Sequence, residues 1–252
     1  MTRYSILTFV MGNYDRVREP LVVSENCEYV LVTDNPSLRS DTWRIKYIPS
    51  YLNDKDGFTK SFYVRYHPFE FVDTPVCIVL DASIQIMKNL DRLISDFIDS
   101  GKSIGLSVHW YIQNSHTEYP YWVEQRGYPL EQMCRSLAFM KAVGYNTAYK
   151  GCFETTMKIQ KNDSLNNEIN SIVWETLLKI GNGSADRVDQ SIFSAVINTL
   201  FEGCSVFPFT RSLYQSSYLK SFHHNSDRVL NVCITKKDFY LFNNPVECYT
   251  LC

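Results

Sequence analysis

One apolar run that ends in a carboxylate decides the fold: Val76-Cys77-Ile78-Val79-Leu80-Asp81-Ala82-Ser83-Ile84. No turn residue separates the apolar part from Asp81, which is typical of a strand buried on both faces. In open α/β sheets, ligands bind outside the carboxyl ends of the strands. The run therefore predicts a strand that places Asp81 where it can hold a metal, a metal-bound phosphate or a sugar hydroxyl. An Asp that caps a following turn would give the same pattern.

Three shorter β-rich runs precede this strand, and each ends in polar residues. They are expected at residues 5–10, 29–33 and 43–48. The first run breaks at Gly12 and Asn13, two residues that tolerate the backbone of a tight turn. Each run therefore places polar groups at the carboxyl end of its strand.

A helix is predicted over residues 58–69, because Phe58, Phe62 and Tyr66 recur at helical spacing. With this aromatic stripe packed inward, Lys60 is expected on the outward side of the helix.

The rest of the chain alternates between strands and helices. Helices are expected at residues 90–98, from 130 to a stop at Gly144, at 164–180 and at 188–200, and strands at 103–108 and 152–160. Ser164 is the expected N-cap of its helix, and Asp189 lies in a first turn. Residues 109–128 lack a clear period, so a long aromatic loop is expected. This alternation favours an α/β fold, with a mostly parallel, Rossmann-like sheet covered by helices on both faces in one domain.

Charge and motif content disfavour several classes of function. Lys and Arg number 25 against 27 Asp and Glu, a formal net charge of −2. Proteins that bind nucleic acid through many phosphates normally carry a basic excess, so no nucleic-acid partner is expected. No GxxxxGK[ST], GxGxxG or GxSxG motif is present, which disfavours ATPases, dinucleotide dehydrogenases and α/β-hydrolases.

Cysteine usage and hydropathy favour a cytoplasmic location. Eight cysteines are scattered without a CxxC pair, as expected of reduced thiols and not of a zinc site or a disulfide framework. The chain enters a strand-like run at once, which predicts no signal peptide. No run approaches the ~20 apolar residues of a membrane span, so no transmembrane segment is expected. Peripheral association with the inner face of a membrane stays open.

Four motifs occur in a fixed order in the first third of the chain. They are Phe9-Val10-Met11-Gly12-Asn13-Tyr14-Asp15, Tyr29-Val30-Leu31-Val32-Thr33-Asp34, Trp43 and Leu80-Asp81-Ala82-Ser83-Ile84. Together they resemble the N-terminal half of GT-A type glycosyltransferases. More narrowly, they are similar to the glycosyltransferase-like family first catalogued as a domain of unknown function, which has plant cell-wall and bacterial polysaccharide members. The resemblance implies one GT-A-like domain over residues 1–252, with a nucleotide-sugar-binding half at 1–108 and an acceptor-side half and C-terminal tail at 109–252.

The resemblance implies a donor site at the carboxyl edge of this first half. Val10, Gly12 and Asn13 would line the nucleoside, Asp34 would contact its base or ribose, and Lys60 would approach the diphosphate. A diphosphate leaving group gains negative charge in the transition state, which a lysine or a metal can stabilise. A solvated helix lysine is the alternative interpretation of Lys60.

The metal motif departs from the family pattern, because Ser83 stands where the second acid of Asp-x-Asp is usual. By the resemblance, Asp81, Ser83 and His223 would hold Mn²⁺ or Mg²⁺ at the donor diphosphate, with His224 as the alternative histidine. Asp81 is also expected to act in catalysis.

Transfer with inversion needs a general base for the acceptor hydroxyl. Asp189 is the candidate, and Gln190 would contact the donor sugar, since the pair is similar to an Asp-Gln element of GT-A enzymes. Helix capping by Asp186 and Asp189 is the alternative. Glu124 and Glu154 are rival bases.

The aromatic segment suits an acceptor, because sugar ring faces stack on Trp and Tyr while hydroxyls bind carboxylates. Trp110, Tyr121, Trp122 and Glu124 are the expected acceptor-binding residues. A loop that folds its aromatic side chains into a minor core is the alternative.

These observations predict a glycosyltransferase that uses a nucleotide-sugar donor and a saccharide or lipid-linked acceptor, in polysaccharide or glycoconjugate synthesis. Two alternatives stay open: a catalytically inactive carbohydrate-binding protein of the same fold, and a Mg²⁺-dependent nucleotidyltransferase.

Overall fold

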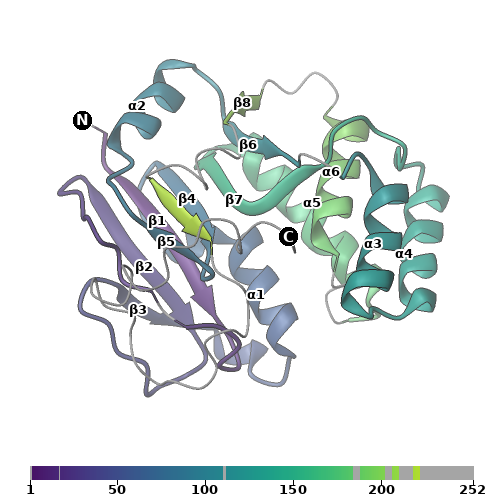
Figure 1. The fold of residues 1–252 in the computed structure, drawn as a ribbon, viewed down its shortest axis with the longest axis horizontal. Helices are drawn as coiled ribbons and strands as arrows, with labels where there is room; N and C mark the ends of the chain where they lie inside the picture. Colours follow the sequence, from purple (N-terminus) through teal and green to yellow (C-terminus); the bar gives the residue numbers. More distant parts are fainter. Residues whose placement is uncertain are drawn as a thin grey trace.

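The computed structural model describes residues 2–16, 18–109, 112–183, 188–201, 206–209 and 218–221. A seven-stranded sheet with the order β3-β2-β1-β4-β7-β6-β8 forms its centre (Figure 1). The strands are β1 Tyr4–Val10, β2 Cys27–Thr33, β3 Arg44–Tyr47, β4 Val76–Asp81, β6 Ile104–Val108, β7 Phe153–Lys161 and β8 Val206–Pro208. A second, two-stranded sheet pairs β5 Ile84–Ile86 with β9 Leu219–Ser221.

The central sheet is mostly parallel, as predicted. The first four strands in its order run parallel to one another, and β8 runs parallel to β6. Only β7 is reversed among the described strands of this sheet, because it pairs antiparallel with both β4 and β6.

Helices cover both faces of the sheet. They are α1 Gly57–Tyr66, α2 Asp91–Asp99, α3 Ser115–Arg126, α4 Leu130–Ala142, α5 Ser164–Ile180 and α6 Asp189–Leu200, with short 3-10 turns η1 Ser50–Leu52 and η2 Pro68–Glu70. One face packs on α2, and the other packs on α1, α5 and α6. At the far end from β3, α3 lies beside α6, and α4 packs on α3 and α5 (Figure 1). No described helix has the length and apolarity that crossing a bilayer requires.

Strands β1 and β4 carry mostly apolar residues because both of their faces are buried. Along β1, Tyr4 and Ile6 pack into the core on the α2 face, whereas Leu7 and Phe9 pack into the core on the α1 face. Every residue of β1 is buried. A strand buried on both faces lacks the alternation of polar and apolar residues that a half-exposed strand shows. This is why β1 and β4 were predicted from apolar runs.

The expected loop at residues 109–128 is wrong in part, because residues 115–126 form α3. The Asn114 side chain accepts a hydrogen bond from the His116 backbone N–H (3.1 Å), and Thr117 completes a capping box. These caps begin the helix despite Pro120 inside it, and Tyr119 packs into the core on its inner side. The Asn-x-x-Thr spacing was the available signal.

Two smaller expectations are also corrected. The N-cap of α5 is Asp163, not Ser164, because the Asp163 carboxylate accepts from the Asn166 backbone N–H (2.9 Å). Lys60 does not point outward: it is 9% exposed. Helix α1 is buried on two sides, through Phe62 in one core and Val64 in another. The side opposite the aromatic stripe, where Lys60 was expected to be exposed, therefore does not face solvent.

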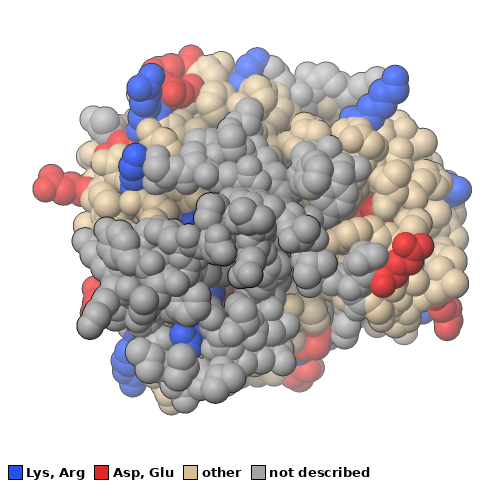
Figure 2. Space-filling model, viewed as in Figure 1, with Lys and Arg blue, Asp and Glu red and all other residues tan. Residues whose placement is uncertain are grey.

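Charged side chains are mixed on the face shown in Figure 2. Described Lys and Arg residues and described Asp and Glu residues both occur around its rim. This mixture agrees with the formal net charge of −2.

Candidate functional site

The carboxyl ends of β1 and β4 meet at the point where the order of the strands reverses. Successive strands β1, β2 and β3 step to one side, whereas β4 pairs with the other side of β1. In the strand register, Asp81 lies opposite Phe9, directly before the loop that follows β1. Open α/β sheets bind ligands at such a switch point. The predicted position of Asp81, at the carboxyl end of its strand, is therefore confirmed.

The loop after β1 is tied to the end of β2. Gly12 and Asn13 both have a positive φ, +59° and +55°, the left-handed conformation that Gly and Asn tolerate best. The Gly12 backbone N–H donates to Asp34 Oδ1 (2.9 Å), and the Asn35 amide donates to Asn13 Oδ1 (2.9 Å). Val10, which ends β1, is buried below them. The structure thus brings four of the predicted donor residues together.

Lys60 joins the same group from α1. Its Nζ lies 3.1 Å from Asp34 Oδ2, so the two oxygens of Asp34 are shared between the lysine and the Gly12 N–H. Asp56 caps α1 by accepting from the Thr59 N–H (3.0 Å), which fixes the first turn that carries Lys60. We call Gly12, Asn13, Asp34 and Lys60 the Asp34 group.

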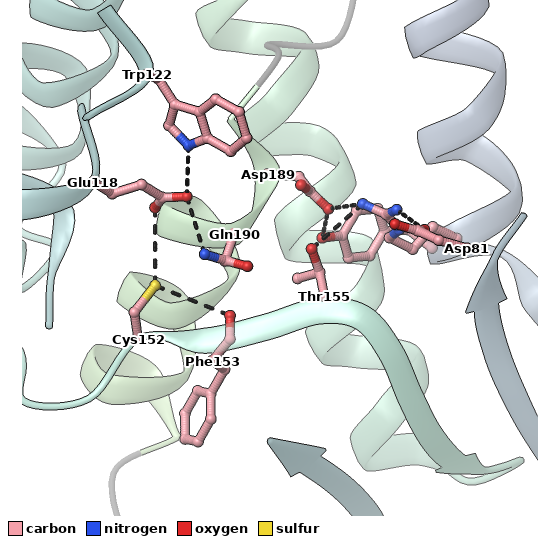
Figure 3. Close-up of polar contacts among 10 residues, drawn as sticks. Asp81, Glu118, Trp122, Cys152, Phe153, Thr155, Asp189 and Gln190 are labelled. Carbon is pink, nitrogen blue, oxygen red and sulfur yellow. Dashed lines mark hydrogen bonds and ion pairs between the residues drawn. The ribbon is translucent and has the colours of Figure 1, made fainter. Parts of the chain in front are cut away.

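A second group centres on Arg65, at the other end of α1, a residue that the sequence analysis missed. Its guanidinium donates to Asp81 Oδ1 and to Asp189 Oδ2, the latter at 2.5 Å. Asp189 Oδ2 also accepts from the Tyr66 hydroxyl (2.9 Å), and Thr155 Oγ1 lies 3.4 Å from Arg65 Nη1. We call Arg65, Asp81, Asp189 and Tyr66 the Arg65 group; Figure 3 shows its two carboxylates turned toward the same point.

The charged side chains of the Arg65 group have little contact with water. Burial alone would lower the pKa of Arg65, but the carboxylates of Asp189 and Asp81 raise it above its ordinary value. Asp189 is the first residue of α6, where the positive end of the helix dipole favours a carboxylate. The N-cap is Val188, and no described side chain makes a capping hydrogen bond there, so Asp189 favours the helix only through the dipole, which is compatible with its place in the site.

Lys158 of β7 lies beside the Arg65 group. It is fully buried, and its Nζ lies 4.1 Å from the centre of the Tyr66 ring and 5.0 Å from that of Phe193. Among the described residues Nζ has no hydrogen-bond partner. Burial, and then the positive charge of Arg65, lower the pKa of Lys158 well below its ordinary value, which favours the uncharged amine.

Gln190 follows Asp189 but points the opposite way, toward Glu118 of α3 (Figure 3). Glu118 is fully buried, and its Oε1 accepts from Gln190 Nε2 (3.1 Å) and Trp122 Nε1 (3.0 Å). Its Oε2 accepts from the Ser191 hydroxyl and from Cys152 Sγ (3.8 Å). Glu118 was not predicted, because a glutamate in an aromatic segment gives no sign of being buried.

Two of the aromatic residues predicted to bind an acceptor, Tyr121 and Trp122, lie on α3. The Trp122 and Tyr128 rings are parallel, 5.3 Å apart at 14°, and the Tyr121 ring meets Trp122 edge-on at 5.5 Å. Tyr121 and Trp122 also pack against the core, as the alternative interpretation of this segment expects, and acceptor binding stays a prediction. Glu124 is exposed.

The remaining predicted residues lie apart or outside the described part of the chain. Glu154 is buried, where it accepts from the Ser107 hydroxyl (3.1 Å) and lies 3.8 Å from His109 Nε2. Ser83 is buried between β4 and β5. The residues Trp110, Asp186, His223 and His224 lie outside the described residues.

The described residues do not by themselves fit a divalent cation. Asp81 is the carboxylate expected to hold it, and the Arg65 guanidinium already binds Asp81. A cation on Asp81 would lie next to that positive charge, which Coulomb repulsion opposes most strongly where water is excluded. Within the described ranges, no group of three His, Cys, Asp or Glu side chains could hold a metal.

Comparisons with known proteins find matches among solved structures only. No protein family and no curated protein matches the sequence. Among solved structures, the chain is similar to mouse xyloside xylosyltransferase 1 in its apo form, with a TM-score of 0.48 and 11% sequence identity. The match covers 82% of this chain and 85% of that one. A likeness at this level carries no argument about function, which we take from the geometry of the site.

Proposed function

We propose that the chain is a glycosyltransferase that moves a sugar from a nucleotide-sugar donor to a saccharide or lipid-linked saccharide acceptor. One observation carries the proposal: the Asp34 group and the Arg65 group lie on α1 and on neighbouring strand ends at the switch point of the sheet. A nucleotide sugar has two parts, a nucleoside diphosphate and a sugar, and two adjacent polar groups suit these parts.

The Asp34 group would bind the nucleoside diphosphate. The left-handed turn at Gly12 and Asn13 lets the backbone approach a ligand closely. In the free protein Lys60 is held by Asp34. A diphosphate would compete for Lys60, and Asp34 would then be available to a ribose hydroxyl or a base N–H. This exchange keeps both charged groups paired before and after binding.

The Arg65 group would bind the sugar. The guanidinium holds the two carboxylates in place, so they need no reorganisation to accept hydrogen bonds from sugar hydroxyls. Asp189 Oδ2 is occupied by Arg65 and Tyr66. We therefore propose that Asp189 Oδ1 accepts from a hydroxyl of the donor or of the acceptor. Asp81 and Asp189 would be the catalytic carboxylates.

The acceptor would approach from α3. Trp122 and Tyr121 offer flat apolar faces for a sugar ring, and Gln190 lies between this helix and Asp189. No step of this scheme is routed through Mn²⁺ or Mg²⁺. The predicted set of Asp81, Ser83 and His223 stays a prediction that metal addition tests.

A ligand panel tests the donor site. Thermal unfolding is followed with UDP-, GDP- and CMP-sugars and with the matching diphosphates, each with and without Mn²⁺. We expect at least one nucleoside diphosphate to raise the melting temperature of the native protein, because a ligand that binds only the folded state stabilises it. Lys60→Met should reduce the shift, whereas Arg92→Met, a change at a side chain 86% exposed on α2, should not. The donor-site proposal fails if no nucleotide shifts the native protein.

An inactive carbohydrate-binding protein is the second candidate. It is favoured by Ser83, which replaces the usual second acid, and by Asp81 being bound to Arg65. It predicts that an oligosaccharide raises the melting temperature while no nucleotide sugar is consumed. Product analysis separates the third class, because a nucleotidyltransferase would release pyrophosphate instead of transferring a sugar.

A further inference from the structure

We propose that Glu118 is a positioning residue that ties Gln190, the chain neighbour of Asp189, to Trp122, on the acceptor side. The inference rests on the proposed function for the roles of Asp189 and Trp122, but the coupling itself is a property of the folded chain.

A single oxygen makes the link. Glu118 Oε1 accepts from both the Gln190 amide and the Trp122 indole N–H, at 3.1 and 3.0 Å (Figure 3). Gln190 is adjacent in the chain to Asp189, which binds Arg65. If the Trp122 indole moves, it must therefore either break its hydrogen bond to Glu118 Oε1 or shift this oxygen, which also binds Gln190.

The other oxygen fixes Glu118 to the two elements behind it. Oε2 accepts from the Ser191 hydroxyl on α6 and from Cys152 Sγ at the start of β7. Ser194, one turn after Gln190, accepts from the Phe153 N–H (2.8 Å) and lies 3.5 Å from Cys152 Sγ. The start of α6, the start of β7 and α3 thus form one connected polar network around Glu118.

A carboxylate is a costly choice for a purely structural role at this place. Its described hydrogen-bond partners are uncharged donors, so no cation among them offsets its burial. Replacing a buried charged group by apolar residues that pack well is often neutral or stabilising. What the carboxylate adds is the ability to accept several donors at once, which aligns groups from different elements.

The charge state of Glu118 supports this role. Burial raises the pKa of Glu118 to about 7, and the negative charge of Asp189 acts in the same direction, whereas the bonds from Ser191 and Trp122 oppose it. The other titratable groups that face it are Cys152 and Tyr149, and burial raises the pKa of both, so they stay uncharged at neutral pH. Protonation would replace one accepting position by an O–H donor and loosen the network.

Tryptophan fluorescence tests the coupling without any substrate. The emission of the native protein is titrated from pH 5.5 to 8.5, and the signal of Trp122→Phe is subtracted. The subtraction is needed because His67 lies 5.5 Å from Trp174 and its titration would affect that ring. We expect the emission that remains after subtraction to change near pH 7. This change should be absent in Glu118→Gln and unaltered in Glu131→Gln, the exposed control on α4.

A second variant keeps the test valid if Glu118→Gln does not fold. In Gln190→Leu the carboxylate loses one donor, so the Trp122 transition should move to higher pH. A transition that keeps its midpoint in Gln190→Leu, or that survives in Glu118→Gln, would overturn the inference.

Kinetics then separates this inference from the proposed function. With a donor that the native protein uses, Glu118→Gln should lower kcat by roughly 10–100-fold, since small misplacements of reacting groups cost about that much. The binding of the nucleoside diphosphate should be unchanged. Equal losses in kcat for Glu118→Gln, Gln190→Leu and the double variant would support a shared role; additive losses would overturn it. If the fluorescence coupling is found but no sugar is transferred, the proposed function fails and the coupling stands.

Discussion

The Asp34 group and the Arg65 group lie on the same helix but are built differently. The Lys60 and Asp34 side chains are 11% and 20% exposed, and both belong to the first third of the chain. The Arg65, Asp81 and Asp189 side chains are 8%, 14% and 9% exposed, and Asp189 comes from α6, far along the sequence. The Asp34 group is therefore slightly more accessible, as the partner exchange proposed for it requires, whereas the Arg65 group is a junction of α1, β4 and α6.

The largest expected effect tests whether the Arg65 group is such a junction. Arg65→Met leaves the buried Asp189 and the partly buried Asp81 without their guanidinium partner, so the free energy of unfolding should fall by about 3–5 kcal/mol. Urea unfolding at neutral pH measures it. Arg92→Met is the matched control at an exposed arginine and should change the free energy of unfolding by less than about 0.5 kcal/mol. Equal effects of the two substitutions would show that Arg65 does not hold the carboxylates.

The next effect is a pH dependence of stability that comes from Glu118, whose partner Gln190 is the chain neighbour of Asp189. Because the folded-state pKa of Glu118 is raised from 4.5 to about 7, its contribution to stability is full below about pH 4.5 and is lost as the pH rises through 7. Unfolding at pH 5 and pH 8 should therefore differ between the native protein and Glu118→Gln. We expect the native protein to lose up to roughly 3 kcal/mol more than the variant over this range. Parallel pH profiles would place the Glu118 pKa at its ordinary value.

Lys158 gives a smaller effect of opposite sign. Its buried amine lacks a hydrogen-bond partner among the described residues and has a lowered pKa, so Lys158→Met should raise the free energy of unfolding by about 1–2 kcal/mol. Urea unfolding measures this as well, with Lys179→Met at an exposed lysine as the control. A destabilised Lys158→Met variant would mean that the amine is charged and balances the two carboxylates.

The smallest stability effect is expected in the Asp34 group. Lys60→Met removes a partly exposed ion pair, so the free energy of unfolding should change by no more than about 1 kcal/mol. The affinity for a nucleoside diphosphate, measured by calorimetry, should fall roughly tenfold, because charged hydrogen bonds contribute about 1.5–3 kcal/mol. A large loss of stability with unchanged affinity would reverse the contrast between the two groups.

The sequence predicted the parts of the fold that periodicity controls. Helix α5 has its predicted bounds, and β4 carries Asp81 to the predicted edge. Gly12, Asn13, Asp34 and Lys60 were predicted as one donor site and lie together. Their common signal is local, since each follows a strand or begins a helix.

The sequence did not predict the groups that depend on distant contacts. Arg65, Glu118 and Lys158 are charged residues that look solvated in a linear pattern, and each is buried by elements that come later or earlier in the chain. The partners of Arg65 lie on β4 and α6, and those of Glu118 on α6 and before β7. Only the folded sheet brings these segments to one edge.

The most direct test of the account is transfer of a labelled sugar by the native protein and by Asp81→Asn. With the nucleotide sugar that gives the largest thermal shift, the native protein should move the label to an oligosaccharide or lipid-linked acceptor. Asp81→Asn keeps the Arg65 pair with Asp189, so it should stay folded while transfer falls by at least roughly 100-fold, the scale of losing one electrostatic catalytic contact. Transfer that is retained in folded Asp81→Asn would contradict a catalytic site at the carboxyl end of β4.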